Sequence, residues 1–240
     1  MPTGPAVPAP EAASAWDAAT RACRDVRAAT ATLRLSARAG RCRIPSVRVG
    51  LALNGSRAIA LTAQVGGTSL FRLAGPAEQA TLFLRDGPRV LRAPAADIVE
   101  ALVGVRLDPG RLLALLSGCL TPRPELVRAA RRDGLLEVTA PDSVAYLEEI
   151  DGAGWRLRAG TFETLQVDYA RQGPTSPREI QIRSLPSAGG APISITISDL
   201  EIDPNPPLPT ALFDPPATAG AAPISLEDLR ATCPTGGARN

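Results

Sequence analysis

The chain has 240 residues, of which 45% are apolar, so it is long enough to bury a sizeable core in one or two domains. Its 26 basic residues are all arginine and nearly balance 24 acidic residues, and aromatic residues make up only 3%, which argues against a nucleic-acid partner. Because lysine and histidine are both absent, the sequence excludes Schiff-base lysine chemistry, Ser-His triads and imidazole metal sites.

The first segment, residues 1–11, is rich in proline and alanine, and this composition predicts an extended tether. Residues 12–30 have a high alanine content and an apolar spacing typical of a helix, with Trp16, Cys23 and Val26 on one face. No signal peptide and no apolar run of about 18 residues is visible.

The hydrophobic period then changes to two. Leu33 and Leu35 begin an alternation that continues to Leu91, interrupted by turn signals such as Asn54-Gly55 and Gly66-Gly67. This pattern predicts a meander of six strands joined by short turns.

Two short helices are predicted in residues 94–118. Gly104 suits the left-handed position after the first helix, and Asp108, Pro109 and Gly118 suit the cap, first turn and stop of the second. Neither helix is long enough to be stable alone in water, so each must lie on the sheet.

The second half of the chain returns to strand-like alternation. Residues 121–134 are an ambiguous connection, because Pro122 and Pro124 favour a loop and Arg128, Arg131 and Arg132 favour a solvated face. Six short strands are expected between residues 136 and 200, with the clearest alternation at Ile193, Ile195 and Ile197. A proline-rich coil follows at residues 203–216, and Ser225 with Asp228 predicts a capped helix.

Together these elements predict an α+β fold. It is a single strongly curved antiparallel sheet, an incomplete β-barrel of about 11–12 strands. An N-terminal helix, two central helices and a short C-terminal helix cover its concave side. The predicted domain spans residues 12–231, and residues 232–240 form a tail.

The four cysteines are Cys23, Cys42, Cys119 and Cys233, and none has C-x-x-C spacing, which argues against zinc and thioredoxin-type sites. An even count allows three disulfide pairings, and four buried free thiols are the alternative. The favoured pairing is Cys23–Cys42 with Cys119–Cys233, because a strand that runs back along the first helix would bring residues 23 and 42 close together.

No catalytic constellation is found. The sequence contains no G-x-S-x-G elbow, phosphate loop or metal constellation, so neither an enzyme nor a cofactor is expected. Glu148 and Glu149 are neighbours on a strand and point to opposite faces, and Asp97 and Glu100 share the polar face of a helix.

The order of helix, six-strand meander, two helices and second meander resembles the LolB/LolA family of lipoprotein carriers over residues 12–230. Matching stretches are VGGTSLFRLAG (65–75), VRLDPGRLLALLSG (105–118), GAGWRLRAGTFETLQVDYAR (152–171), PISITISDLEID (192–203) and LFDPPATAGAAPISLEDLR (212–230). The evidence is the order and spacing of these stretches, since no single one is highly specific.

The resemblance implies a monomeric periplasmic carrier, anchored to the outer membrane as a lipoprotein. It would receive acyl chains of lipoproteins or lipids, from a LolA-type donor if one exists, and deliver them to the inner leaflet of the outer membrane. The alternative is a non-catalytic envelope lipoprotein of the same fold that binds a protein partner or acts as a sensor.

An acyl cavity needs an apolar lining under a lid that opens. The candidates from the sheet are Val49, Leu51, Ile59, Leu61 and Phe83, and those from the lid are Leu102, Leu112, Leu115 and Leu116. Each of them taken alone is more typical of ordinary core, and the prediction depends on the whole set. The resemblance also implies a membrane-insertion loop at residues 64–68, in which Val65 is the large apolar residue and the alternative role is a simple strand end.

Overall fold

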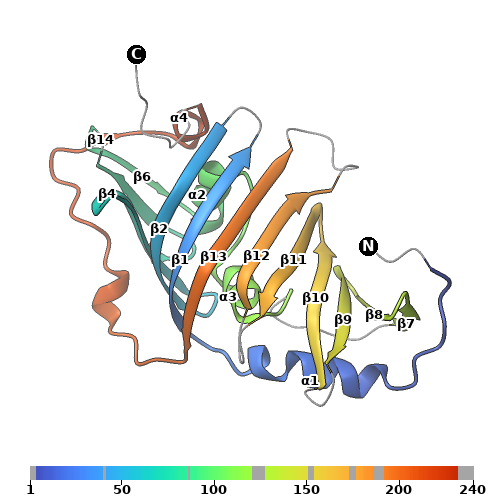
Figure 1. Cartoon of the computed structure of the whole chain (residues 1–240). Helices are drawn as coiled ribbons and strands as arrows, with labels where there is room; N and C mark the ends of the chain where they lie inside the picture. The colour runs from blue at the N-terminus through green and yellow to red at the C-terminus, as the bar shows by residue number, and fades with distance from the viewer. Residues whose placement is uncertain are drawn as a thin grey trace.

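The structure is a computed structural model, and it describes residues 4–39, 42–85, 87–120, 128–150, 154–172, 177–185 and 192–231. Its central feature is one 14-stranded sheet (Figure 1), with the strand order β14-β6-β5-β4-β3-β2-β1-β13-β12-β11-β10-β9-β8-β7. The strands are β1 (Ala29–Ala39), β2 (Cys42–Asn54), β3 (Ala58–Val65), β4 (Thr68–Pro76), β5 (Ala80–Leu84), β6 (Arg89–Ala93), β7 (Arg128–Arg132), β8 (Leu135–Ala140), β9 (Ser143–Ile150), β10 (Gly154–Phe162), β11 (Leu165–Gln172), β12 (Pro177–Ser184), β13 (Ile193–Pro204) and β14 (Ala222–Pro223).

Two meanders meet in the middle of this sheet. β1 to β6 pair in sequence order, β7 to β13 do the same, and β13 joins the two by pairing with β1. The short β14 pairs with β6 in parallel, whereas the other neighbours are antiparallel. The predicted order of elements and the curved, open antiparallel sheet are therefore confirmed.

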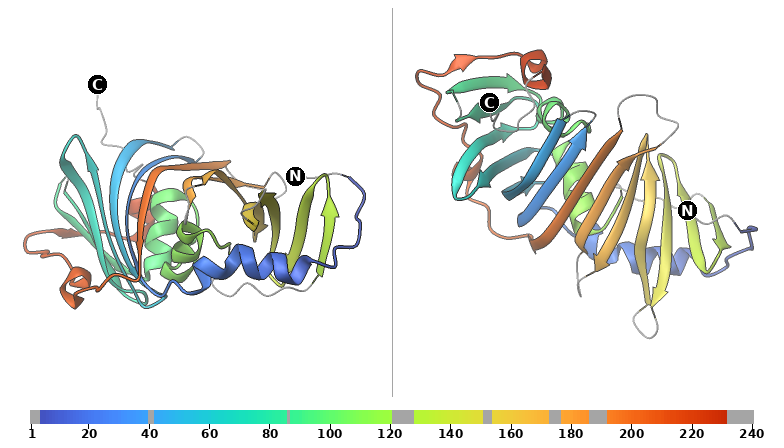
Figure 2. Two further views of the ribbon diagram at one scale, coloured as in Figure 1. Left: turned by 60° about the horizontal axis from the view of Figure 1, so that its bottom comes forward. Right: turned by 45° about the horizontal axis from the view of Figure 1, so that its top comes forward.

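The sheet curves because several strand pairs contain register shifts. Such shifts occur in β2, opposite residues Leu35 to Ala37 of β1, and in β10 between Leu157 and Ala159, and the extra residue bends the strand that carries it. Figure 2 shows the sheet wrapping around two helices that lie on its concave side.

The helices divide this concave side between them. α1 (Ala12–Arg24) lies along β8, β9 and β10, while α2 (Ala95–Val103) contacts β1 and β5, and α3 (Pro109–Ser117) contacts β2, β12 and β13. The short α4 (Leu226–Ala231) packs on α2. Within the described part of the chain, no helix combines the length and apolar character needed to span a bilayer.

The predicted caps of the central helices are confirmed. The Asp108 carboxylate accepts hydrogen bonds from the backbone N–H groups of Gly110 at 2.8 Å and Arg111 at 3.0 Å. Gly104 and Gly118 adopt φ values of 80° and 92° just after α2 and α3, a conformation that costs glycine little.

The C-terminal helix also begins as expected. The Ser225 hydroxyl accepts from the Asp228 N–H at 3.0 Å, and the Asp228 carboxylate accepts from the Ser225 N–H at 2.8 Å. These contacts hold the pKa of Asp228 below its usual value.

The first helix is shorter than the predicted span of residues 12–30, since it ends at Arg24. The cause is Asn205, which follows β13. Its side-chain oxygen accepts from the N–H groups of Arg27 at 2.6 Å and Ala28 at 3.2 Å, and its amide donates to the Asp25 carbonyl at 3.0 Å. A side chain so distant in sequence replaces the hydrogen bonds that a longer helix would need.

Segments near the two chain ends cover the two edges of the sheet. Val7 exchanges two backbone hydrogen bonds of 3.0 and 2.8 Å with Arg131 on the edge strand β7, and Glu11 forms an ion pair with the same arginine at 2.6 Å. On the opposite edge, Ala222 and Ile224 donate backbone hydrogen bonds to Pro88 and Val90 beside β6. Residues 128–132, expected as part of a connection, are thus an edge strand.

The C-terminal coil follows the outside of the sheet. Its 3-10 helix η2 (Thr210–Phe213) contacts β3 and β4, and Figure 1 shows the segment running from the end of β13 towards β14. The predicted proline-rich coil therefore serves as the connection that brings β14 to the edge of the sheet.

Candidate functional site

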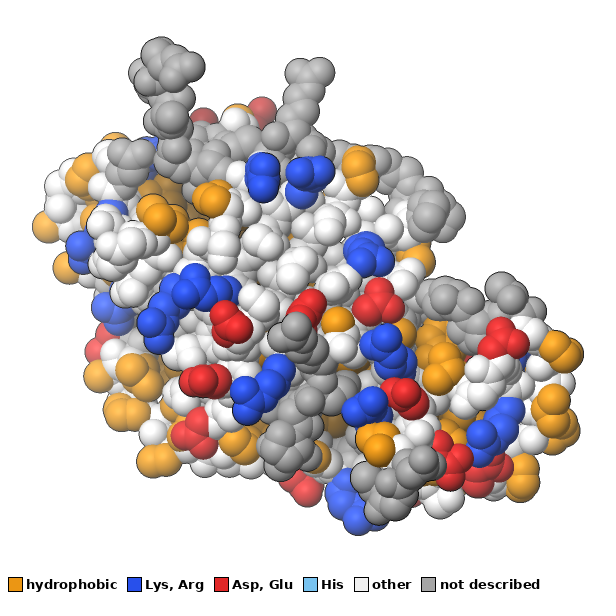
Figure 3. All heavy atoms as spheres, viewed as in Figure 1, with side chains coloured by type: hydrophobic (Ala, Val, Ile, Leu, Met, Phe, Trp, Pro, Cys, Tyr) orange, Lys and Arg blue, Asp and Glu red, His pale blue; other side chains and the backbone are white. Residues whose placement is uncertain are grey.

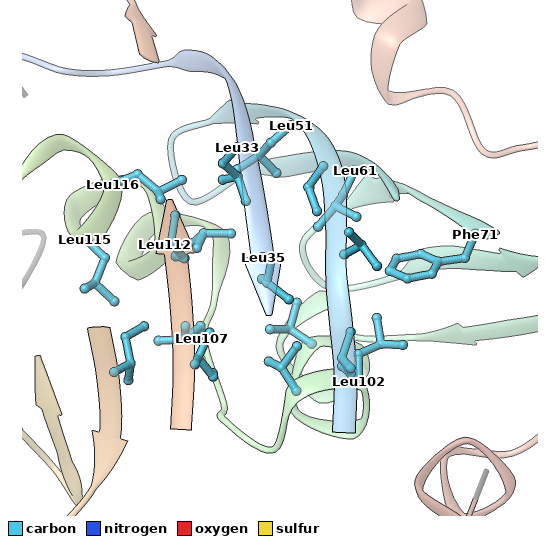
Figure 4. A pocket seen from close by; sticks show the side chains of 18 of the residues that line it. Leu33, Leu35, Leu51, Leu61, Phe71, Leu102, Leu107, Leu112, Leu115 and Leu116 are labelled. Atoms are coloured by element: carbon cyan, nitrogen blue, oxygen red, sulfur yellow. The ribbon is translucent and has the colours of Figure 1, made fainter. Parts of the chain in front are cut away.

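An apolar cavity of about 90 Å³ lies between the concave face of the sheet and the helices α2 and α3 (Figure 4). Its walls come from β1–β4, β12 and β13 on one side and from α2, α3 and their connection on the other. The lining residues are Leu33, Leu35, Ile44, Val47, Val49, Leu51, Leu61, Leu70, Phe71, Val99, Leu102, Val103, Leu107, Leu112, Leu115, Leu116, Ile182, Ile195 and Ile197. All of these side chains are aliphatic or aromatic, so the lining suits hydrocarbon and contains no ionisable or nucleophilic group.

Seven of the nine predicted lining residues lie in this wall, and two lie elsewhere. The seven are Val49, Leu51, Leu61, Leu102, Leu112, Leu115 and Leu116. Ile59 is 1% exposed and packs in the core beyond the cavity. Phe83 lies between the buried Leu82 and Leu84, and because successive strand residues point to opposite faces, its side chain leaves the concave side.

Three further lining residues come from the second meander and were not among the predicted ones. Ile182, Ile195 and Ile197 line the cavity because β13 pairs with β1, with Ile197 opposite Leu35. The alternation around Ile195 was a visible signal of a half-buried strand. The strand lies next to β1 because two distant segments of the chain pair. Alternation within one strand does not predict which other strand it pairs with.

Seven residues of the cavity lining are only partly buried. Five of them mark its mouth, namely Leu35 and Ile44 of the β1–β2 hairpin, Leu70 and Phe71 of β4, and Val103 at the end of α2, and the other two are Leu61 and Leu112. The residues at the mouth show that apolar surface remains accessible to a ligand at this end of the strands.

Val65 lies near this mouth, at the tip of the β3–β4 hairpin. Its backbone pairs with Thr68, two positions beyond the pair of Ala63 with Phe71, and its side chain is 43% exposed. The predicted loop therefore presents one apolar side chain to solvent at the end of the strands where the cavity opens.

A disulfide joins Cys23 of α1 to Cys119, which follows α3, with their Cα atoms 5.9 Å apart. The predicted pairing of Cys23 with Cys42, and of Cys119 with Cys233, is wrong. α1 ends beside Ala29, at the start of β1, whereas Cys42 pairs with Ala39 at the far end of that strand, roughly 33 Å away at strand geometry. The Cys42 side chain and residue 233 lie outside the described part of the structure.

Tyr169 holds the end of α3 in addition to the disulfide. Its buried hydroxyl lies 3.3 Å from the Leu115 carbonyl and 3.2 Å from the Cys119 carbonyl, and it donates to these acceptors at the helix end. Burial raises the pKa of Tyr169 far above its ordinary value of 10.0, so the phenol stays protonated as a donor.

The end of α2 is held more weakly. Arg106, which follows it, pairs with Asp97 and lies 3.4 Å from Glu100, but its side chain is 60% exposed. Exposed ion pairs contribute about 0–1 kcal/mol. α2 is thus held by these exposed ion pairs and by its packing on α4, β1 and β5, whereas α3 is also anchored by a covalent bond and a buried hydrogen bond.

The cavity is small for a binding site. Pockets that bind small molecules usually measure about 300–1,000 Å³, and this one measures about 90 Å³. A long hydrocarbon chain does not fit into it in the arrangement that the structure shows.

Known proteins were compared by sequence and by structure. The sequence matches no protein-family model and no curated protein. A LolA superfamily protein from Nitrosomonas europaea superimposes with a TM-score of 0.50 and 13% identity, covering 85% of this chain and 97% of that one. This likeness shows that the chain has a LolA-like fold, as the resemblance predicted.

Two further solved structures are less similar. A DUF1329 family protein from Desulfovibrio piger gives a TM-score of 0.47 at 13% identity, covering 85% of this chain and 97% of that one. The lipoprotein LppX from Mycobacterium tuberculosis gives 0.33 at 11% identity, covering 84% and 99%. Neither superposition is close enough to support a conclusion about this chain.

Proposed function

We propose that this protein binds the acyl chains of lipoproteins or lipids in the cavity under α2 and α3, and passes them to the outer membrane. The observation that carries the proposal is the lining, which is apolar throughout and remains partly exposed at the mouth. Transfer of a hydrocarbon into such a site contributes about 0.8 kcal/mol per methylene before the costs of ordering and opening. Binding and release then require neither a nucleotide nor a metal.

Because the cavity is small, a chain enters only if the lid opens. Displacing α2 breaks the exposed contacts of Arg106 with Asp97 and Glu100 and the packing of α2 on α4, β1 and β5. Hydrocarbon contacts of an inserted chain replace this packing. The anchored end of α3 preserves the other wall, so the cavity enlarges from one side.

In this proposal the hairpin that carries Val65 contacts the membrane when the acyl chain is delivered. An exposed valine next to the mouth gives the protein an apolar contact with a bilayer at the place where the chain leaves the cavity. In this proposal the protein acts in the periplasm, anchored to the outer membrane, and receives its cargo from a donor of the LolA type.

A second candidate function is a partner-binding or sensory module of the same fold. The small closed volume and the covalent anchor of α3 favour it, because a permanently closed lid would leave the cavity as an ordinary packing defect. The two functions differ in one property, which is whether the purified protein takes up a fatty acid.

Uptake is tested with a fluorescent fatty acid and with mass spectrometry of lipids extracted from the purified protein. Wild type should bind one chain, and Leu112→Trp, which fills the cavity, should weaken binding about tenfold or more, since lost chain contacts of about 1.4 kcal/mol give that factor. Leu212→Trp is the matched control, because Leu212 is 40% exposed on the outside of the sheet. Absence of binding to wild type would favour the partner-binding module.

Delivery is tested separately with Val65→Glu. This variant should bind the fatty acid as wild type does but transfer it more slowly to vesicles, because a charge resists contact with the bilayer. Val7→Glu is the control, since Val7 is also exposed but lies on the β7 edge. Equal transfer by the two variants would contradict a role of Val65 in insertion.

A further inference from the structure

A polar groove of about 440 Å³ lies on the outer face of the sheet, over β2, β1 and β13. Two arginines and four hydroxyl residues line it, together with the backbone bulge of β2 at Pro45 and with Ala37 and Ile44. The six polar residues are Ser36, Arg38, Arg43, Ser46, Ser194 and Thr196. We call this site the Arg38–Arg43 groove.

The register of the three strands places these side chains together. Arg38 on β1 lies directly opposite Arg43 on β2 and opposite Ser194 on β13, and Ser36 lies opposite Thr196. A register shift between Leu35 and Ala37 hollows the surface beside Ser46. The hydroxyl groups and the two guanidinium groups therefore border one depression.

Like charges directly opposite each other across two strands are destabilising. The β1–β2 hairpin contains two such pairs, because Arg38 lies opposite Arg43 and Arg34 lies opposite Arg48 on the same outer face. Arg34 has a carboxylate neighbour, Asp199, at 3.1 Å. For Arg38 and Arg43, by contrast, the described part of the chain provides no ion pair, and no acidic residue lines their groove. Figure 3 shows arginine side chains gathered on this face, including over the upper ends of β1 and β2.

We infer that the Arg38–Arg43 groove binds a phosphate group. Two planar guanidinium forks match the geometry of phosphate oxygens, and charge-assisted hydrogen bonds of this kind are about twice as strong as neutral ones. The four hydroxyl groups supply further donors in the same depression. A bound dianion or phosphodiester also relieves the repulsion between Arg38 and Arg43, for which the described residues provide no ion pair.

The phosphate has two possible sources, a free phosphate compound or the head group of a phospholipid. Ile44 lines both this groove and the apolar cavity, so the groove lies across the β1–β2 hairpin from the cavity mouth. The inference rests on the arginines and hydroxyls of the outer face, and it holds whether or not the cavity takes up an acyl chain.

The test uses the full chain and two kinds of probe. Calorimetric titration with inorganic phosphate and with glycerol 3-phosphate measures binding of free compounds, and sedimentation with phosphatidylcholine vesicles, with and without phosphatidylglycerol, measures binding of a head group. The groove variant is Arg38→Ser/Arg43→Ser. The matched control is Arg34→Ser/Arg48→Ser, which removes the same charge from the same face of the same hairpin.

The groove variant should lose about tenfold or more in affinity for whichever probe binds, and the control should lose about threefold or less, because it changes only the general charge of the face. Binding of the free compounds identifies a soluble ligand, and binding only to phosphatidylglycerol vesicles identifies a lipid head group; either result supports the groove. Equal losses in the two variants would overturn it, as would the absence of binding to every probe. The urea midpoint of each variant shows that it is folded.

Discussion

The two halves of the sheet differ in how completely side chains fill the space between the strands and the helices that cover them. The hollow half consists of β1–β6, β12 and β13 under α2 and α3, and the filled half consists of β7–β11 under α1. In the filled half, inward residues such as Leu136, Val138 and Leu147 are 0% exposed. In the hollow half, inward residues such as Leu61 and Phe71 remain half-buried around the cavity.

The difference originates in the residues that each helix presents to the sheet. α1 buries Ala12 and Ala15 beside Trp16, so its backbone lies close to the strands and one large ring fills the remaining space. α2 and α3 also bury alanines, but leucine and valine side chains such as Val99, Leu102 and Leu115 line the space between these short helices and the sheet. The cavity therefore lies where large branched side chains face a strongly curved surface.

The largest expected effect comes from breaking the covalent link between the halves. The Cys23–Cys119 disulfide spans 96 residues, and Cys23→Ser/Cys119→Ser should lower the free energy of unfolding by about 4 kcal/mol, because loop closure no longer restricts the unfolded chain. Urea unfolding measures the change. Reduction of wild type should reproduce it, and an unchanged midpoint in both experiments would show that the bond adds nothing to stability.

A pair of leucine truncations compares the packing of the two halves directly. Leu147→Ala, in the filled half, should cost about 3 kcal/mol, whereas Leu112→Ala, beside the cavity, should cost about 1 kcal/mol, because some of its neighbours are already missing. Urea unfolding of the two variants gives both values. Equal costs would mean that the hollow half is as tightly packed as the filled one.

A pair of glycine substitutions tests how closely the filled half is packed, with an exposed glycine as the reference. In the filled half, a Cβ at Gly160 would collide with Leu120 and lie 2.6 Å from the Val144 carbonyl oxygen, so Gly160→Ala should cost about 2 kcal/mol. A Cβ at Gly50, on the outer face of β2, has no heavy atom within 4 Å, and Gly50→Ala should change stability by less than about 0.5 kcal/mol. Thermal unfolding distinguishes these outcomes, and a neutral Gly160→Ala would contradict the close packing of β10.

The smallest effect concerns Tyr169, which extends from the filled half to the end of α3. Tyr169→Phe should cost about 1 kcal/mol near neutral pH, because the carbonyls of Leu115 and Cys119 lose their donor. The variant should also alter the alkaline stability. The folded-state pKa of Tyr169 is raised, so this group's contribution is complete below its ordinary pKa of 10.0 and is lost as the pH rises above that value.

Wild type should therefore lose stability above pH 10 more steeply than Tyr169→Phe. Urea midpoints measured on both sides of that pH test the prediction. Burial also raises the pKa of Tyr146, and because this residue is present in both proteins its effect cancels in the comparison. Parallel pH profiles would show that Tyr169 ionises without unfolding the protein.

Local features of the sequence were sufficient where short-range chemistry determines structure. Asp108 and Gly118 identified the ends of α3 because a cap acts within a few residues, and the alternation of Val49 and Leu51 identified a strand face. The same period, applied strictly to Leu82 and Leu84, would have placed Phe83 on the outer face. The alternation therefore predicts an outward-facing Phe83, contrary to its place among the predicted cavity residues.

Long-range features were not predictable in this way. The pairing of Cys23 with Cys119 depends on α1 crossing the end of α3, and nothing near either cysteine specifies that crossing. Likewise, β7 contains three arginines and no alternation, and it is a strand because β8 offers a hydrogen-bonding edge on one side and Val7 caps it on the other.

The segments that cover the two edges of the sheet also affect how the protein associates with other molecules in solution. An open sheet of this size exposes backbone donors and acceptors on its outermost strands, and unprotected edges of this kind recruit strands from other molecules. Val7 on one side and the Ala222–Pro223 segment on the other occupy those positions, and a proline there cannot donate to an incoming strand. The fold can thus keep a hollow, incompletely closed architecture while resisting growth into fibrils by edge-to-edge addition.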